Sequence, residues 1–133
     1  VILLTKGQLD RLDEELDRYK NIENKIFLRR QEIIYNKKFT EHSSGSNKIS
    51  NPTENTIIRL ESDIVLRNLE LFKEIVELLL EKLTPEQKIL FKMHWLGEQL
   101  TWEEISERLD RPVRRIKKQR RAIIEAYANM INL

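Results

Sequence analysis

The 133-residue sequence has no cysteine and contains only two histidines, three glycines and three prolines. Without cysteine, disulfide bonds and thiolate metal sites are excluded, and two histidines are too few for a histidine-built zinc centre. With 35% charged and 40% hydrophobic residues, the scarcity of glycine and proline favours long amphipathic helices over a turn-rich β fold. We therefore expect an all-α protein of a single small domain, or of one domain with an appendage.

Long apolar runs and enzymatic motifs are also lacking. No run approaches the ~18 apolar residues needed to span a bilayer, and the opening run 1–4 has no basic leader or cleavage signal. Glycine-rich phosphate loops, zinc motifs and catalytic dyads are absent, and no acid is placed to orient His42 beside its neighbouring serines. We expect a soluble, cytoplasmic protein that is not an enzyme, needs no cofactor or metal and does not contact membranes.

The positive charges are unevenly distributed. Residues 1–83 carry 14 basic and 15 acidic residues, whereas residues 84–133 carry 10 basic and 7 acidic ones. The stretch 111–121 contains no acid and seven basic residues, namely Arg111, Arg114, Arg115, Lys117, Lys118, Arg120 and Arg121. Such a cluster predicts contact with a polyanion, although a solvated helix face is the alternative. The prediction requires that these side chains are exposed and not neutralised by neighbouring carboxylates.

Two long helices are predicted before this basic region. The first, from about 8 to 35, has an apolar stripe at three- and four-residue steps, formed by Leu9, Leu12, Leu16, Tyr19, Ile26 and Ile33. Residues 36–52 have little periodicity and many small polar side chains, so a flexible connector is expected there.

The second long helix, from 53 to about 83, has apolar residues on more than one face. Its most regular stripe, interrupted only by Asn68, consists of Ile57, Leu60, Ile64, Leu71, Ile75 and Leu78. A wider set is formed by Val65, Leu66, Leu69, Phe72, Val76, Leu79 and Leu80. We expect residues 1–83 to form an antiparallel helical hairpin, with a coiled-coil homodimer as the competing use of the same stripe.

Short helices with clear start signals follow in residues 84–133. Thr84 and Thr101 each begin a capping box, with Gln87 and Glu104 as the respective third helical residues, and Pro112 can open a last helix. Two tight junctions before the most basic helix indicate a helix-turn-helix DNA-binding domain. Because its fifty residues would bury too little surface alone, we expect the second long helix to complete its core.

Helical geometry assigns two faces to the last helix. At about 100° per residue, Val113, Ile116, Ile123, Ile124 and Tyr127 form an apolar arc, with Arg114 and Lys118 opposite. The predicted DNA contacts are bases for Arg114 and Arg115 and phosphates for Lys117, Lys118 and Arg121, completed by Arg111, Thr101 and Trp102.

Two of the neighbouring side chains have competing interpretations. Trp102 flanks apolar periodic positions, so core packing is favoured over stacking on bases. Arg120 points toward the apolar side of the helix, where it either extends outward or pairs with an acid of the second long helix.

The segment 83–124 resembles the part of bacterial sigma factors that reads the −35 promoter element. The matching residues are Leu83-Thr84-Pro85-Glu86-Gln87-Lys88-Ile89-Leu90, Leu100-Thr101-Trp102-Glu103-Glu104-Ile105, Leu109 and Ile116. Asp110-Arg111-Pro112 stands where that family usually has Gly-Val-Ser, which predicts a looser or differently packed turn.

The layout of the whole chain resembles the RinA/ArpU-like late-transcription regulators of Gram-positive phages and prophages. The similarity lies in the helical segment 19–34, the Ser/Asn-rich stretch before Thr56, and residues 84–124. It implies a regulator in the bacterial host cytoplasm that binds double-stranded promoter DNA, and RNA polymerase, to activate late genes. The alternatives are a small terminase subunit for DNA packaging and a protein-interaction module that contacts polymerase.

Overall fold

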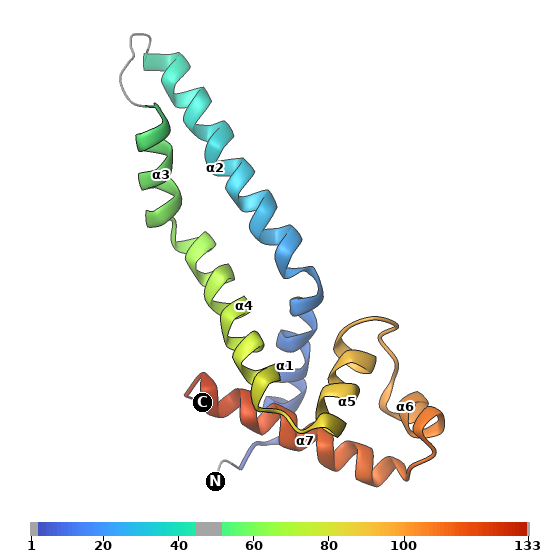
Figure 1. Ribbon diagram of the computed structural model, residues 1–133. Helices are drawn as coiled ribbons and strands as arrows, with labels where there is room; N and C mark the ends of the chain where they lie inside the picture. The colour runs from blue at the N-terminus through green and yellow to red at the C-terminus, as the bar shows by residue number, and fades with distance from the viewer. Residues whose placement is uncertain (1–2, 45–51, 133) are drawn as a thin grey trace. The chain divides into compact units, whose positions relative to one another are not determined.

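The computed structural model describes residues 3–44 and 52–132, with the backbone alone for 36–44 and 52–53 (Figure 1). The described residues form no strand, which confirms the all-α prediction. The helices are α1 (Lys6–Asp17), α2 (Ile22–Ser44), α3 (Pro52–Ser62), α4 (Ile64–Lys82), α5 (Pro85–Trp95), α6 (Trp102–Leu109) and α7 (Val113–Met130), with a 3-10 turn, η1 (Arg18–Asn21), between α1 and α2. None of these helices, over the described residues, combines the length and apolar character needed to cross a membrane.

Capping boxes fix the starts of α1, α5 and α6. The hydroxyl groups of Thr84 and Thr101 each accept a hydrogen bond from the backbone N–H three residues ahead. In return, the backbone N–H of each cap donates to the side-chain oxygen of Gln87 or Glu104. Both boxes were predicted. Thr5 caps α1 in the same way, so this helix begins earlier than expected.

The chain divides into two compact units, and the division differs from the expected boundary after residue 83. The first unit consists of Val1–Lys20 and Glu74–Leu133, and the second of Asn21–Lys73. The first unit therefore includes α1 and the end of α4 together with α5, α6 and α7. This division is consistent with a need for extra apolar surface, because the segment after Thr84 is too short to enclose a core alone.

The first unit has a continuous apolar core. Helix α7 packs against α1, α5 and α6. The largest fully buried side chains of this unit are Trp95, Tyr127, Phe91, Leu12, Leu16, Leu79, Leu90, Ile105, Ile116, Ile123, Ile124 and Val76. Leu9, Leu12 and Leu16 are buried, which confirms the inward face predicted for the start of the chain.

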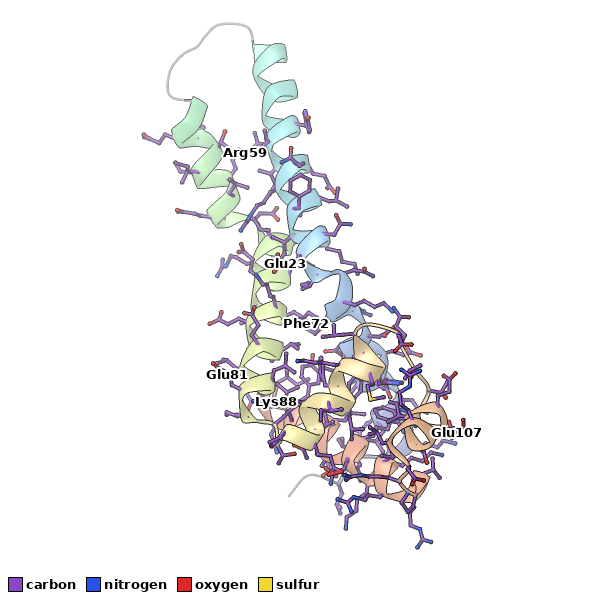
Figure 2. The ribbon with its side chains drawn as sticks, turned by 45° about the vertical axis from the view of Figure 1, so that its right-hand side comes forward. Glu23, Arg59, Phe72, Glu81, Lys88 and Glu107 are labelled. Carbon is purple, nitrogen blue, oxygen red and sulfur yellow. The ribbon has the colours of Figure 1, made fainter. Side chains whose placement is uncertain are left out.

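The second unit is built from helices joined by ion pairs. Helices α2 and α3 pack side by side (Figure 1). Arg29 pairs with Asp63 at 2.7 Å, Arg30 pairs with Glu70 at 2.7 Å, and Glu23 (labelled in Figure 2) pairs with Lys73 at 2.8 Å. Among the described residues of this unit, the buried hydrophobic side chains are those of Ile22, Ile26, Ile33 and Leu66.

Three sequence expectations for the long helices need correction. The first helix is interrupted at η1, and the second is interrupted at Asp63, whose carboxylate accepts a hydrogen bond from the Leu66 N–H at 2.7 Å and so caps α4. The predicted flexible connector 36–52 is also shorter than expected, because residues 36–44 belong to α2 and Pro52 begins α3. Its remaining residues, 45–51, lie outside the described residues.

The most regular stripe of the second long helix is not its buried face. Ile57, Ile64, Leu71 and Leu78 are exposed, whereas Leu66, Val76 and Leu79, from the wider set, are buried. The two sets lie on different sides of α4, and the intramolecular core uses the less regular one.

Candidate nucleic-acid interface

A tight turn positions α7 against α6. Asp110 ends α6 in the left-handed conformation, with φ 53° and ψ 51°, which Asp tolerates better than most residues other than Gly. The backbone N–H of Arg111 donates to the Ser106 carbonyl at 3.1 Å, and the Ser106 hydroxyl donates to the Arg111 carbonyl. Asp110 thus takes the left-handed conformation that suits the glycine found at this position in the sigma-factor segment. The two hydrogen bonds between Ser106 and Arg111 close the turn, so it is not loose.

Helix α7 has a buried and an exposed side, as its periodicity predicts. Its buried residues are Ile116, Ile123, Ile124, Tyr127 and Ala128. On the other side Arg114, Arg115, Lys117 and Lys118 are exposed in the first half of the helix. The basic side chains are therefore concentrated where the helix follows the turn.

Arg114 and Lys118 are the free cations of this surface. Neither has an ion pair or side-chain hydrogen bond to another described residue. They are four residues apart, so they project from the same side of α7. An anion can reach both side chains without displacing an internal partner.

The remaining exposed cations have weak carboxylate partners. Glu86, at the start of α5, accepts from Arg111 at 2.6 Å and from Arg115 at 3.4 Å, and Glu103 on α6 lies 3.3 Å from Lys117. All three cations are more than two-fifths exposed, and ion pairs at such positions contribute little to stability. Five cations face two carboxylates, which leaves an excess of three positive charges on this surface.

Arg120 is a structural residue. It donates to Asp13 at 3.0 Å and to Asp10 at 3.2 Å, both on α1, and its guanidinium lies 5.9 Å from the centre of a Trp102 ring. Its predicted partner was an acid of the second long helix. The acids of the first helix take that place because α1 packs directly on α7.

Arg121 is also held by the protein. It donates to the Glu125 carboxylate at 3.1 Å and to the Leu4 carbonyl at 2.9 Å. The predicted cluster of seven cations is therefore split, because Arg120 and Arg121, unlike the others, bond to groups of the N-terminal segment 4–13. Sequence proximity alone did not reveal the acids that approach from α1, α5 and α6.

Thr101 and Trp102 serve the fold of α6. The Thr101 hydroxyl accepts the Glu104 N–H at 3.1 Å as a helix cap. Trp102 is 8% exposed and stacks on His94 with ring centroids 3.9 Å apart. Burial removes Trp102 from the residues able to stack on bases, as the core-packing interpretation expected.

Asp13 is the centre of a polar cluster that sequence reasoning missed. It accepts hydrogen bonds from Trp95 at 2.9 Å and Arg120 at 3.0 Å, and lies 3.3 Å from His94. Burial favours a higher pKa for Asp13, but the interactions with His94, Trp95 and Arg120 outweigh it and lower the pKa below 3.8. The cluster joins α1, α5 and α7 from three distant stretches of sequence, which no local motif marks.

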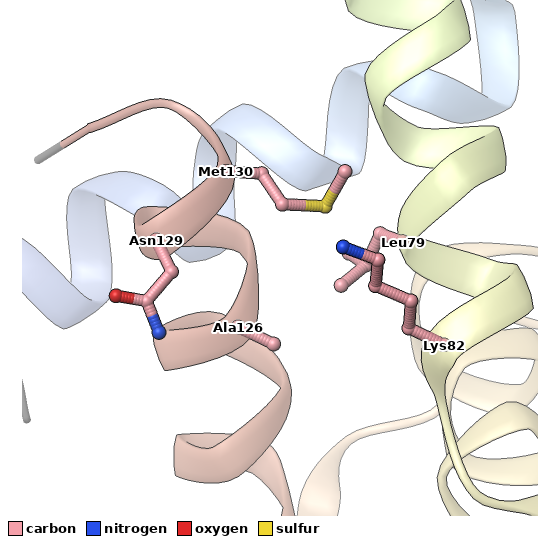
Figure 3. A pocket seen from close by; sticks show the side chains of 5 residues that line it. All are labelled: Leu79, Lys82, Ala126, Asn129 and Met130. Atoms are coloured by element: carbon pink, nitrogen blue, oxygen red, sulfur yellow. The ribbon is translucent and has the colours of Figure 1, made fainter.

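A pocket lies near the other end of α7. It has a volume of about 290 Å³ and is lined by Leu79, Lys82, Ala126, Asn129 and Met130 (Figure 3). Lys82 is its one titratable side chain, so the lining offers no acid–base pair. Among the described residues, no group of His, Asp and Glu side chains is arranged to hold a metal ion.

One family model matches this chain over residues 8–129, and its description is a protein of unknown function (DUF722). No curated protein and no solved structure gives a significant match. The match covers most of the chain but assigns no activity to it.

Proposed function

We propose that this chain, which belongs to the DUF722 family, is a sequence-specific DNA-binding protein that regulates transcription. In this proposal α6, the turn 110–112 and α7 act as a helix-turn-helix, and the exposed side of α7 enters the major groove. The observation that carries the proposal is the pair of unpartnered cations, Arg114 and Lys118, on the outer side of a helix whose inner side is buried.

The position of the cations on α7 favours DNA over a general acidic surface. Recognition helices contact bases mainly through their N-terminal residues, and Arg114 and Arg115 lie in the first turn of α7. A major groove about 12 Å wide admits one helix, and arginine pairs with the O6 and N7 atoms of guanine. Lys118, one turn further on, would then lie near the phosphates.

The ion pairs of Glu86 and Glu103 do not oppose this function. Each pair is solvent-exposed and contributes little to stability, so phosphate oxygens can replace the carboxylates at small cost. Arg120 and Arg121 are left out of the interface, since both are engaged within the first unit. The proposed contact set is Arg111, Arg114, Arg115, Lys117 and Lys118.

The resemblance to the RinA/ArpU-like group supplies a narrower form of the proposal. It is that the protein activates late genes of a phage or prophage by binding promoter DNA. Activation, the phage setting and contact with RNA polymerase rest on that resemblance, whereas DNA binding also rests on the geometry of α7.

Footprinting on DNA that flanks the native gene, followed by binding titrations with single variants, tests the proposal. Arg114→Ala should weaken binding to the protected site by about 1–3 kcal/mol and relax the preference at one base pair. Lys118→Ala should weaken binding to all sequences alike. Lys92→Ala, which removes an exposed charge from α5, is the matched control and should bind like the parent chain.

Absence of binding to any duplex at low salt would contradict the proposal. Equal losses for Lys92→Ala and Lys118→Ala would contradict the placement of the interface on α7, because they would show that only net charge matters.

A further inference from the structure

Exposed apolar side chains are concentrated in the second unit. Of the eleven large hydrophobic side chains exposed among the described residues, eight lie between Asn21 and Lys73. They are Phe27, Leu28, Tyr35, Ile57, Ile58, Ile64, Val65 and Leu71. Isolated exposed hydrophobic residues are common on soluble proteins, but a dense group indicates an interaction surface.

Part of this group forms a straight row on α4. Ile64, Leu71 and Leu78 are 68%, 53% and 44% exposed and are spaced seven residues apart, and Ile57 on α3 precedes them at the same spacing. Seven residues make almost two helical turns, so the three residues of α4 lie along one line. We call Ile64, Asn68, Leu71, Ile75 and Leu78 the heptad stripe.

The heptad stripe has the composition of a two-stranded coiled-coil contact. Asn68 and Ile75 alternate with the row at steps of four and three, which places Ile64, Leu71 and Leu78 at d positions and Asn68 and Ile75 at a positions. Ile75 at an a position, Leu71 and Leu78 at d positions and a single Asn, Asn68, at the other a position favour two strands. Such a stripe is complementary to a second copy of itself, as a two-fold symmetric interface requires.

The neighbouring charges argue against a lipid surface as the occupant. Helix α4 carries four acidic residues, Glu70, Glu74, Glu77 and Glu81, against three basic ones, Arg67, Lys73 and Lys82, so it has no net positive charge to attract anionic lipid headgroups. Its apolar residues also follow a seven-residue spacing instead of the broad apolar face of a membrane-surface helix.

The exposed area of the stripe fits a weak, reversible interface. The exposed aliphatic side chains of Ile64, Leu71 and Leu78 offer roughly 100 Å² each. Two copies would bury about 600 Å² of this apolar surface, to which the flanking side chains add, so the dimer should dissociate on dilution.

We propose that two copies of this chain associate through the heptad stripe of α4. The dimer itself does not depend on DNA binding. Its consequence for the site does rest on the proposed function: a dimer carries two copies of α7, so its DNA target would contain two related half-sites.

Light scattering and sedimentation equilibrium on the full chain, without DNA, test the dimer. The parent chain should have twice the monomer mass of 16.0 kDa at tens of micromolar and dissociate on dilution. The double variant Ile64→Glu, Leu71→Glu should be monomeric, with at least about 100-fold weaker association, because it places charges in the apolar contact. Ile89→Glu, at a half-exposed isoleucine on α5 outside the stripe, is the matched control and should stay dimeric.

A second variant keeps the proposal testable if the double variant loses its helical circular dichroism. Asn68→Leu removes the polar residue from the stripe and should strengthen association by about 10-fold or more. A parent chain that stays monomeric at 100 µM, or unchanged association in Asn68→Leu, would overturn the proposal. A ring of many subunits would also overturn it and would favour the DNA-packaging alternative.

DNA binding separates the two proposals. A monomeric protein that binds duplex DNA would remove the dimer and leave the proposed function intact. A dimer that binds no DNA would remove the proposed function and leave the dimer intact.

Discussion

The two units of the molecule differ in where their charged and apolar side chains lie. The first unit encloses two tryptophans and a tyrosine and ties partly buried Asp13 to side chains from two other helices. The second unit joins its helices largely by ion pairs, and eight large apolar side chains among its described residues are exposed. We infer that the first unit is stabilised mainly from within, whereas the second gains stability when its outer face is covered.

Among the substitutions that test this difference, Asp13→Ala should have the largest effect on stability. Asp13→Ala removes the carboxylate that accepts from Arg120 and from the Trp95 N–H, at a site where both charged side chains are mostly buried. Asp10 still accepts from Arg120, and the backbone carbonyl of residue 13 still accepts from Trp95, so we expect a loss of about 2 kcal/mol in the unfolding free energy of the first unit. Urea unfolding followed by tryptophan fluorescence measures it, because Trp95 and Trp102 are the only tryptophans of the chain and both lie in this unit.

Glu14→Ala, at an exposed neighbouring acid on α1, is the control for Asp13→Ala and should change the midpoint little. Equal effects of the two substitutions would show that the polar cluster does not stabilise the first unit.

Tyr127→Phe should have a smaller effect in the same unit. Burial and the hydrogen bond to Glu15 raise the pKa of Tyr127, so the hydroxyl stays protonated and donates to the Glu15 carboxylate at neutral pH. Removing this bond should cost about 1 kcal/mol, measured by the same fluorescence titration. A loss as large as that of Asp13→Ala would contradict the expectation that the Asp13 cluster stabilises the first unit more than the Tyr127–Glu15 hydrogen bond does.

Low pH should destabilise the second unit by protonating Asp63. The hydrogen bond from Arg29, followed by that from the Leu66 N–H, lowers the pKa of Asp63 from 3.8 to about 2. A carboxyl group with a lowered pKa stabilises the fold above its unfolded pKa, and this contribution is lost as pH falls from about 4 to about 2. Asp63→Asn should therefore lower the thermal midpoint, followed by circular dichroism, at pH 7 and converge with the parent chain near pH 2.

Glu61→Gln, which removes an exposed acid two residues earlier, is the control for Asp63→Asn and should not change the pH dependence. A constant difference between Asp63→Asn and the parent chain from pH 7 to pH 2 would contradict the assignment.

Glu86→Gln should have a small effect on stability and a visible effect on DNA. It releases Arg111 and Arg115 and raises the net positive charge of the interface by one. We expect a several-fold gain in affinity for non-specific duplex at low salt, with less than about 1 kcal/mol change in unfolding free energy. Glu98→Gln, which breaks the exposed pair with Arg108, is the control, and an equal gain there would remove the local role of Glu86.

Local patterns predicted much of the first unit. The capping boxes of Thr84 and Thr101, the inward face of α7 and the burial of Leu12 and Leu16 follow from hydrogen bonding and helical periodicity within one segment. The box of Thr5 and Gln8 has the same signature and could have been found by the same rule.

Interactions between distant segments could not be predicted in the same way. Arg120 was placed on the apolar side of its helix, but its partners on α1 depend on how the helices pack. Likewise, a stripe with perfect spacing was assigned to the hairpin interior, although Leu66, Val76 and Leu79 fill that role. Periodicity identifies a face that can be buried, and only tertiary packing determines which face is.

The salt dependence of DNA binding tests the central claim most directly. If Arg111, Lys117 and Lys118 each neutralise one phosphate, log K should fall with log salt at a slope of about −2.7 per chain. The double variant Arg114→Ala, Lys118→Ala should reduce the slope by about one, because Lys118 is its phosphate contact, and weaken binding to every duplex. A parent slope near zero, or a slope that the double variant leaves unchanged, would contradict a DNA interface on the exposed side of α7.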